Sequence, residues 1–180
     1  MDKQTFLDYI ELEVYCGSKS PLKRTYERYF NPVTNAAYIF RKMQYLRSVG
    51  GVFNKIRAEF LKRKLVMKYG IVASPDSQIG KGLKFVHPTS VVIGACVHAG
   101  ENLSLYQNTT LGGARIGDVK KGNQPNIGDN VTVFANSLIL GNVQIGSNVT
   151  VGANSLVLDD APDGSVCVGS PARIIKLKVE

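Results

Sequence analysis

Two histidines, His87 and His98, carry the imidazole groups of this chain. An imidazole with an ordinary pKa of about 6.5 can accept a proton from a weakly acidic hydroxyl and return it later, as general base catalysis requires. His87 lies in the segment Phe85–Thr89, and His98 lies in the segment Cys96–Gly100. The residue types alone therefore indicate proton transfer at one of these positions, without choosing between them.

The three cysteines indicate neither a disulfide framework nor a zinc site. Cys16, Cys96 and Cys167 are an odd number and form no CxxC pair. Cys96 and Cys167 lie in apolar surroundings, where formation of the nucleophilic thiolate is disfavoured, so we expect no covalent intermediate on either sulfur. Two histidines are also too few for the three-histidine zinc site of a β-helical carbonic anhydrase. We expect no metal.

The chain is basic, with a formal net charge of +8, which favours anionic partners such as a phosphorylated cofactor or an anionic membrane surface. Nine lysines or arginines and a single acid, Glu59, lie between residues 41 and 68. The nine are Arg41, Lys42, Arg47, Lys55, Arg57, Lys62, Arg63, Lys64 and Lys68. A basic amphipathic helix can lie on an anionic membrane, or its apolar stripe can pack on the trimer while the cations stay in water. We expect packing, with membrane contact secondary, and no nucleic-acid binding, because no recognised binding module accompanies the charge.

A period of six indicates the elements that must position these residues. An isoleucine or valine stands at every sixth position along residues 127–157, and a small or β-branched residue follows four positions after each of the first five. Neither an α-helix nor an ordinary strand demands this period, whereas a parallel β-helix does, since three six-residue sides close one coil. The pattern predicts an all-β parallel β-helix of hexapeptide repeats, with about four coils. The period-six residues are Ile127, Val133, Ile139, Ile145, Val151 and Val157.

Two interruptions of this rhythm mark the places where chemistry is expected. The phase slips by two residues between Phe85 and Ile93, so the slip falls beside His87. Residues 112–125 form a polar excursion, and loops that leave a repeat array are frequent binding sites. The excursion starts at Gly112–Gly113, whose backbone N–H groups can reach an oxygen that becomes negatively charged during a reaction, because no side chain obstructs them.

Upstream of residue 70 the sequence is helical in character, with few glycines and many basic and aromatic residues. The predicted helices are Gln4–Tyr15, Val33–Arg47 and Val52–Lys68. On the third helix, one face carries Phe53, Ile56, Phe60 and Met67. The predicted organisation is an α-helical N-terminal region (residues 1–69), a β-helix domain (70–168) and a C-terminal tail (169–180). The sequence contains neither a signal-peptide core nor a run of apolar residues long enough to span a membrane, so we expect a cytoplasmic protein, soluble or peripheral to the inner face of the membrane.

Residues 70–176 resemble the hexapeptide-repeat acyltransferases, and within them the serine acetyltransferase-like branch. The matching stretches are Ile79–Gly82, Phe85–Thr89, Val92–Gly94, Gln107–Gly113, Pro125–Gly128, Ile139–Asn142 and Gly169–Arg173. The stretches Asn31–Val33, Arg41–Met43 and Gly51–Ile56 are more similar to the short cytoplasmic enzymes of capsule and surface-polysaccharide operons. The resemblance is specific at the level of the superfamily.

The resemblance implies a left-handed coil, a homotrimer and a groove for acetyl-CoA between neighbouring subunits. It assigns the catalytic base to His87, gives His98 no chemical role, and implies direct acetyl transfer to a hydroxyl without an acyl-enzyme. The implied cofactor-binding residues are Gly112, Gly113, Ala135 and Ala153 beside the acetyl and pantetheine groups, and Arg173 and Lys176 near the adenosine 3′-phosphate. Asp76, Gln107 and Glu101 remain alternatives for orienting the base, as does a backbone carbonyl.

Three positions depart from the serine acetyltransferase pattern. Val72 stands at the position where that branch has an aspartate paired with the base. Val86 stands where that branch has an acidic residue directly before the base. Gln124 stands where a second histidine helps to hold the amino acid. Because lost polar contacts discriminate strongly against a polar substrate, we expect a sugar or polysaccharide-precursor hydroxyl as the acetyl acceptor. The alternatives are a serine O-acetyltransferase of cysteine biosynthesis and a non-catalytic trimeric scaffold.

Overall fold

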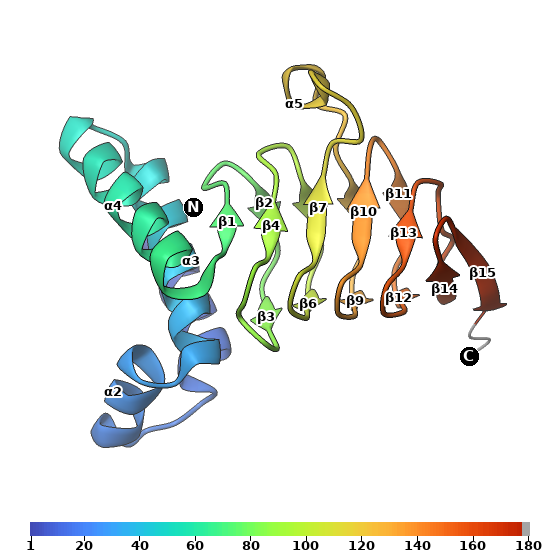
Figure 1. The fold of residues 1–180 in the computed structure, drawn as a ribbon. Helices are drawn as coiled ribbons and strands as arrows, with labels where there is room; N and C mark the ends of the chain where they lie inside the picture. Colours follow the sequence, from blue (N-terminus) through green and yellow to red (C-terminus); the bar gives the residue numbers. More distant parts are fainter. Residues whose placement is uncertain (178–180) are drawn as a thin grey trace.

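A computed structural model describes residues 1–177 of the chain, with side chains through residue 175. A helical region comes first and a stack of short strands follows, with the C-terminal strands at the far end of the molecule (Figure 1). The helices are α1 (Lys3–Ile10), the π-helical turn η1 (Glu11–Tyr15), α2 (Pro21–Tyr29), α3 (Pro32–Val49) and α4 (Val52–Tyr69). Helix α2 is not among the helices predicted from the sequence, and its nine residues bury no side chain.

The strands form three sheets, one along each side of the coil. Sheet A contains β1 (Val72–Ala73), β4 (Val92–Ile93), β7 (Thr110–Gly112), β10 (Leu138–Leu140) and β13 (Leu156–Val157). Sheet B contains β2 (Gln78–Ile79), β5 (His98–Ala99), β8 (Asn126–Ile127) and β11 (Gln144–Ile145). Sheet C contains β3 (Lys84–Phe85), β6 (Ser104–Leu105), β9 (Thr132–Val133), β12 (Thr150–Val151), β14 (Ser165–Gly169) and β15 (Ala172–Leu177). The pairs are parallel except β14 with β15, so the predicted parallel β-helix with a helical N-terminal region is confirmed.

The period-six residues form the interior of the coil. Ile127 lies on sheet B, Val133 on sheet C and Ile139 on sheet A, and all three are almost completely buried. In each six-residue unit of this series, the strand residue and the residue four positions later are both buried, and parallel pairing places like residues above one another. Four coils have all three strands. A fifth is closed on sheet B by a bridge between Ile145 and Ala161.

Asparagines make two of the three corners. Six of them have φ between 56° and 61°, the left-handed region that asparagine tolerates better than most residues. Asn102, Asn130 and Asn148 stack at the corner between sheets B and C, and their amides hydrogen-bond from coil to coil at 2.9 and 3.2 Å. Asn108, Asn136 and Asn154 occupy the corner between sheets C and A. These ladders turn the chain and tie successive coils together.

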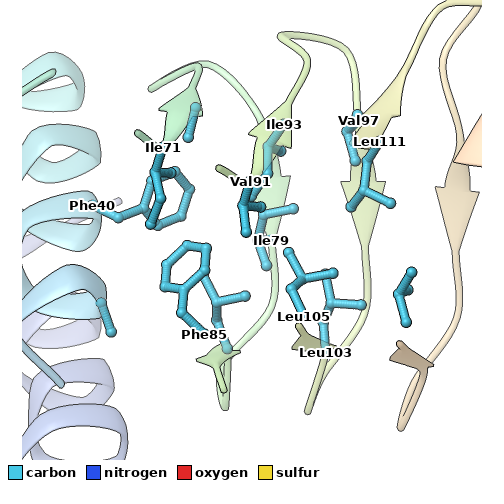
Figure 2. Packing of buried hydrophobic residues seen from close by; sticks show 14 of the residues in the cluster. Phe40, Ile71, Ile79, Phe85, Val91, Ile93, Val97, Leu103, Leu105 and Leu111 are labelled. Atoms are coloured by element: carbon cyan, nitrogen blue, oxygen red, sulfur yellow. The ribbon is translucent and has the colours of Figure 1, made fainter. Parts of the chain in front are cut away.

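The helical region covers the open end of the first coil. Phe40 of α3 is fully buried and meets Phe85 of β3 edge-on, with ring centroids 6.2 Å apart (Figure 2). Figure 2 also shows Ile71 and Ile79 packed in the same apolar layer, which is continuous with the interior of the coil. The helices therefore act as a cap that keeps water from the first layer of the core.

Arg41 is buried at this junction and is not a surface cation. Its Nε and Nη2 contact both carboxylate oxygens of Glu13 at 2.8 and 2.7 Å. Its Nη1 donates to Gln44 Oε1 (3.0 Å) and to the carbonyl of Ile79 (2.8 Å), and its Nη2 also reaches the carbonyl of Gly80 (2.5 Å). All five N–H groups of the guanidinium are thus used, and the helices are tied to the first coil by a buried ion pair.

The apolar stripe of helix α4, which carries Phe53, Ile56, Phe60 and Met67, faces outward. Ala58, Leu65 and Tyr69 are the residues of α4 that are buried, whereas Phe53 and Phe60 are 73% and 66% exposed. Packing of this stripe on a neighbouring subunit of the trimer stays a prediction. The helix carries two apolar faces, and its sequence does not say which one α3 covers.

Candidate active site

His87 occupies a two-residue insertion at the corner between sheets C and A. Eight residues lead from Phe85 to Ile93, whereas six lead from Leu105 to Leu111 in the next coil, although both pairs of ends are in register. The phase slip in the sequence is therefore a bulge of the chain that carries His87 out of the coil wall. The side chain is exposed on this chain, where a substrate can reach it.

An aromatic ladder lies beside His87. The His87 ring meets Tyr106 edge-on, with centroids 5.6 Å apart, and Tyr106 in turn lies against Phe134 at 4.7 Å with a 32° tilt. Val86, Tyr106 and Phe134 follow paired strand residues in three successive coils, so they form one column. Among residues 1–175, no hydrogen bond to the His87 ring is found. The contact that positions the imidazole is therefore Tyr106.

Two of the expected orienting carboxylates lie at other corners. Asp76 is at the corner between sheets A and B, where it pairs with Arg47 at 3.0 Å. Glu101 is at the corner between sheets B and C, where it pairs with Lys81 at 3.3 Å. Gln107 does lie at the corner of His87, and its buried Oε1 has no hydrogen-bond partner in the described part of the chain. The structure therefore separates both acids from the base.

The expected cofactor residues fall into three places. Ala135 and Ala153 lie at the corner of His87, and the coils there are linked by hydrogen bonds from Asn136 N–H to the Gln107 carbonyl (3.1 Å) and from Asn154 N–H to the Ala135 carbonyl (3.0 Å). Gly112–Gly113 lies at the opposite end of the short strands of sheet A. Because Ala135 and Ala153 are small, the outside of the corner that carries His87 is open along its length.

The expected phosphate-binding cations lie at the far end of the coil. Arg173 is exposed on β15, and Lys176 pairs through its backbone with Val166, while its side chain lies outside the described residues. β15 is five strands from β3 in sheet C, which corresponds to about 24 Å at the usual strand spacing. A long ligand is needed to reach from these residues to His87.

Gln124 is used by the fold. It is buried, and its Oε1 accepts the Cys96 N–H at 2.7 Å. A Cβ on Gly94 would lie 2.4 Å from the Gln124 amide, so glycine at that position makes room for it. A glutamine held in this way stabilises the corner between sheets A and B and does not project toward a ligand.

His98 is placed away from His87. It is exposed on β5 of sheet B, with Nδ1 3.0 Å from the Cys96 carbonyl. No other titratable side chain is found bonded to it in the described residues. The structure thus separates the two histidines. Ala135 and Ala153 form a column at the corner that carries His87.

Two cavities of the described chain lie away from His87. One of about 540 Å³ lies between α1, α3 and the first coil and is lined in part by Tyr9, Gln44 and Asp76. Another of about 500 Å³ lies between the excursion and the coil, against Arg115, Asn123 and neighbouring residues. His87 lines neither of them.

Comparison with known proteins places this geometry in a family. The family model described as bacterial transferase hexapeptide (six repeats) matches residues 124–159. Serine acetyltransferase 1, chloroplastic, of Arabidopsis thaliana is 43% identical over 121 residues, which are 67% of this chain and 38% of that protein. The crystal structure of Neisseria gonorrhoeae serine acetyltransferase is 31% identical, with a TM-score of 0.81, over 99% of this chain and 67% of that one. The chain belongs to the hexapeptide-repeat acyltransferases.

A structure of a serine acetyltransferase in complex with CoA is also similar to this hexapeptide-repeat acyltransferase, at 27% identity and a TM-score of 0.76, over 96% of this chain and 71% of that one. The chain spans less than half the length of the curated relatives that it matches. The similarity to the serine acetyltransferase structures includes the helical region, which the family model does not cover.

The thiols of this acyltransferase are poorly placed as nucleophiles. Burial raises the pKa of the Cys167 thiol, which disfavours the thiolate. The Cys96 sulfur lies 3.5 Å from the Val119 carbonyl, on the side of the excursion. Within residues 1–177, no group of three or more His, Cys, Asp or Glu side chains is arranged to hold a metal.

Asp118, which begins helix α5 (Asp118–Lys121), closes the excursion. Its Oδ2 accepts the N–H groups of Arg115 (2.7 Å) and Ala114 (2.9 Å), and Asn123 donates to its Oδ1 at 3.3 Å. These hydrogen bonds, first that from Arg115, hold the pKa of the Asp118 carboxyl below its ordinary value. A Cβ on Gly113 would lie 2.6 Å from the Asp118 Cβ, so glycine is required for the loop to close. Sequence reasoning missed Asp118 because its partners are backbone groups.

Asp118→Ala is expected to open the excursion while the coils stay folded. Trypsin at neutral pH should cut after Arg115, Lys120 and Lys121 several-fold faster in the variant, because the loop loses its hydrogen-bond acceptor. Asp159→Ala, at an exposed acid, is the matched control. Since the folded pKa is lowered, the stabilisation is complete above the ordinary aspartate value of about 3.9 and is lost as the pH falls through the folded value. Equal cleavage of both variants and wild type would exclude this role.

Proposed function

We propose that the chain is an acetyl-CoA-dependent O-acetyltransferase in which His87 is the general base. The observation that carries the proposal is the exposed imidazole of His87 on a bulge beside the column of Ala135 and Ala153, in a fold shared with serine acetyltransferases. His87 takes the acceptor's hydroxyl proton, and the oxygen then forms a bond to the carbonyl carbon of the thioester. The tetrahedral intermediate expels the coenzyme A thiolate, which receives the proton from the imidazolium.

The other proposed roles belong to residues at successive positions along the coil. Backbone N–H groups at Gly112–Gly113, supplied by a neighbouring subunit, stabilise the oxyanion, an interaction worth about 2.7–4 kcal/mol in comparable sites. Ala135 and Ala153 fit the pantetheine arm, since a larger side chain at either would fill the open corner. Arg173 and Lys176 fit the phosphate end, about 24 Å along the coil from His87. These roles require a homotrimer. His87 and Gly112–Gly113 lie at opposite ends of the short strands of sheet A, so they cannot face one substrate in a single chain.

L-serine is the first candidate acceptor. The similar protein from Arabidopsis thaliana and the similar structure from Neisseria gonorrhoeae are both named serine acetyltransferases, and they favour serine over a sugar. A free amino acid carries an ammonium and a carboxylate, which need partners. Val86 and Pro88 flank His87 in this chain and offer none. A serine site therefore also draws its charged groups from elsewhere in the trimer.

A sugar hydroxyl is the second candidate, and the aromatic ladder favours it. Tyr106 and Phe134 lie against each other next to His87, and the equivalent position in the following coil is Gly152, which adds no side chain to this column. The apolar C–H face of a pyranose packs against aromatic rings, while its hydroxyls need only neutral partners. The buried and unpartnered Gln107 Oε1 is an acceptor for such a hydroxyl.

Release of free thiol from acetyl-CoA, with L-serine in one arm and nucleotide sugars and glycans in the other, tests the acceptor. If serine is the substrate, its kcat/KM should exceed that of every sugar by at least about 100-fold, because a site built for polar groups discriminates strongly. Phe134→Ala should then leave the KM for serine nearly unchanged. If a sugar is the substrate, Phe134→Ala should raise its KM by about 2- to 12-fold through lost ring contact. Phe30→Ala, at an exposed ring on the cap, is the control. No thiol release with any acceptor would count against the enzyme itself.

A further inference from the structure

Helix α4 carries an apolar stripe that nothing in the described chain covers. Val52, Phe53 and Met67 are 77%, 73% and 73% exposed, and Ile56 and Phe60 are at least half exposed. The spacing of Phe53, Ile56, Phe60 and Met67 places them on one side of the helix, opposite the face that packs on α3. Helix α4 lies at the end of the molecule opposite the C-terminal strands, so the stripe looks away from the coil (Figure 1).

The stripe is bordered by cations. Helix α4 contains six basic residues and one acid, Glu59, whose carboxylate lies 3.7 Å from Lys62. The basic residues are Lys55, Arg57, Lys62, Arg63, Lys64 and Lys68. The Arg57 guanidinium lies 5.7 Å from the Phe53 ring centre, so its stem follows the apolar surface while its head stays in water.

A hollow deepens the same surface. It has a volume of about 490 Å³, and its apolar lining is Ile56 and Phe60. Lys55, Arg63 and Arg47 form its basic rim, and Glu59 is the acid that also lines it. An apolar floor with a basic rim is complementary to a lipid acyl chain beneath an anionic headgroup.

We propose that the α4 stripe docks this protein on an anionic membrane surface, with Phe53, Ile56 and Phe60 entering the headgroup region. The charge distribution favours this occupant over a two-fold contact with a second copy of the chain. Two stripes packed against each other would bring the basic borders of both helices together, which like-charge repulsion opposes. Anionic headgroups neutralise the same cations. None of the helices in the described residues is long and apolar enough to cross a bilayer, so the contact is with the surface.

Co-sedimentation of the full chain with phosphatidylcholine vesicles, with and without phosphatidylglycerol, tests the proposal. Wild type should partition to the anionic vesicles and lose binding as salt is raised. Arg57→Gln/Arg63→Gln/Lys64→Gln should weaken partitioning by about 100-fold, since each cation near the surface contributes about fivefold. The matched control, Lys3→Gln/Lys19→Gln/Lys81→Gln, removes the same charge from exposed sites outside α4 and should bind nearly as wild type.

A Phe53→Ser/Phe60→Ser variant separates the membrane from a second copy. Both side chains are exposed, so the variant should melt as wild type does while losing vesicle binding. Its mass in solution, measured by analytical ultracentrifugation, should equal that of wild type. A smaller assembly in this variant, with no vesicle binding by wild type, would identify the stripe as a contact between copies and overturn the proposal. Equal binding to neutral and anionic vesicles, or none to either, would also overturn it. None of these readouts uses the acetyl-transfer assay, so they stand or fall apart from the proposed activity.

Discussion

His87→Ala is expected to lower turnover by about 10²- to 10⁴-fold, the usual contribution of a positioned general base. The hydroxyl of serine or of a sugar is scarcely ionised at neutral pH, so without the imidazole the attacking oxygen must lose its proton to water. The side chain is exposed, so the coil should melt close to the wild-type temperature. Thiol release from acetyl-CoA and thermal melting measure the two effects separately.

Coenzyme A binding distinguishes this result from the scaffold alternative. Saturating coenzyme A at about 100 times its Kd should stabilise wild type and His87→Ala alike, by about 2.7 kcal/mol. A scaffold without a cofactor site shows no such stabilisation. His98→Ala is the control for removal of an imidazole, because His98 lies on sheet B and is bonded to the Cys96 carbonyl. Near-normal turnover in His87→Ala would exclude the mechanism.

The coil could be predicted from the sequence because its core is periodic. Each side of a coil buries the same two of its six positions, and interior residues such as Val133 and Ile139 repeat at that spacing along residues 127–157. The position of His87 could be predicted for the opposite reason. The register between coils is fixed by parallel pairing, so two extra residues must leave the wall. Both the period of six and its interruption at His87 can be recognised in the sequence alone.

The contacts around the site were less accessible from sequence. Asp76 and Glu101 are near His87 in sequence, but three-sided coiling sends each to a different corner. Gln124 aligns with a ligand-holding residue of the resembled branch, yet its amide is bonded to the Cys96 backbone. A side chain's direction depends on which corner it occupies and which backbone group is unpaired there, and the period of six carries neither fact.

The helical region was predicted least well, since its partners are distant in sequence. Helix α4 has two apolar faces, and α3 selects the one that includes Ala58 and Leu65. Arg41 was grouped with the exposed cations because the run around it is basic. Its partner Glu13 is 28 residues away, on the π-helical turn η1. A buried ion pair of this kind leaves no local signal.

Arg41→Ala is expected to cost about 3–5 kcal/mol of the free energy of unfolding, because it leaves the Glu13 carboxylate buried without its partner. Both side chains are 0% exposed. The substitution also removes the donors of the Ile79 and Gly80 carbonyls. Urea denaturation followed by circular dichroism measures the loss.

Arg47→Ala supplies the matched control. Arg47 is also on α3 and also binds an acid of the first coil, Asp76, but the two side chains are 42% and 51% exposed. An exposed pair of this kind contributes about 0–1 kcal/mol, so the control should unfold close to wild type. If Arg41→Ala and Arg47→Ala cost the same, the buried pair does not hold the cap to the coil.

A double substitution separates two costs of Arg41→Ala, the loss of the hydrogen bonds that Arg41 donates and the burial of the Glu13 charge without a partner. Glu13 Oε1 also accepts the N–H groups of Gly82 (2.9 Å) and Leu83 (3.1 Å), so Glu13→Leu would orphan both. Glu13→Gln keeps an amide oxygen for them and removes the charge. Combined with Arg41→Met, which fills the vacated volume with an apolar chain, it should recover a large part of the stability lost in Arg41→Ala, because no ion is then buried alone. Recovery would identify desolvation of the carboxylate as the main cost, whereas no recovery would assign the cost to the carbonyls of Ile79 and Gly80.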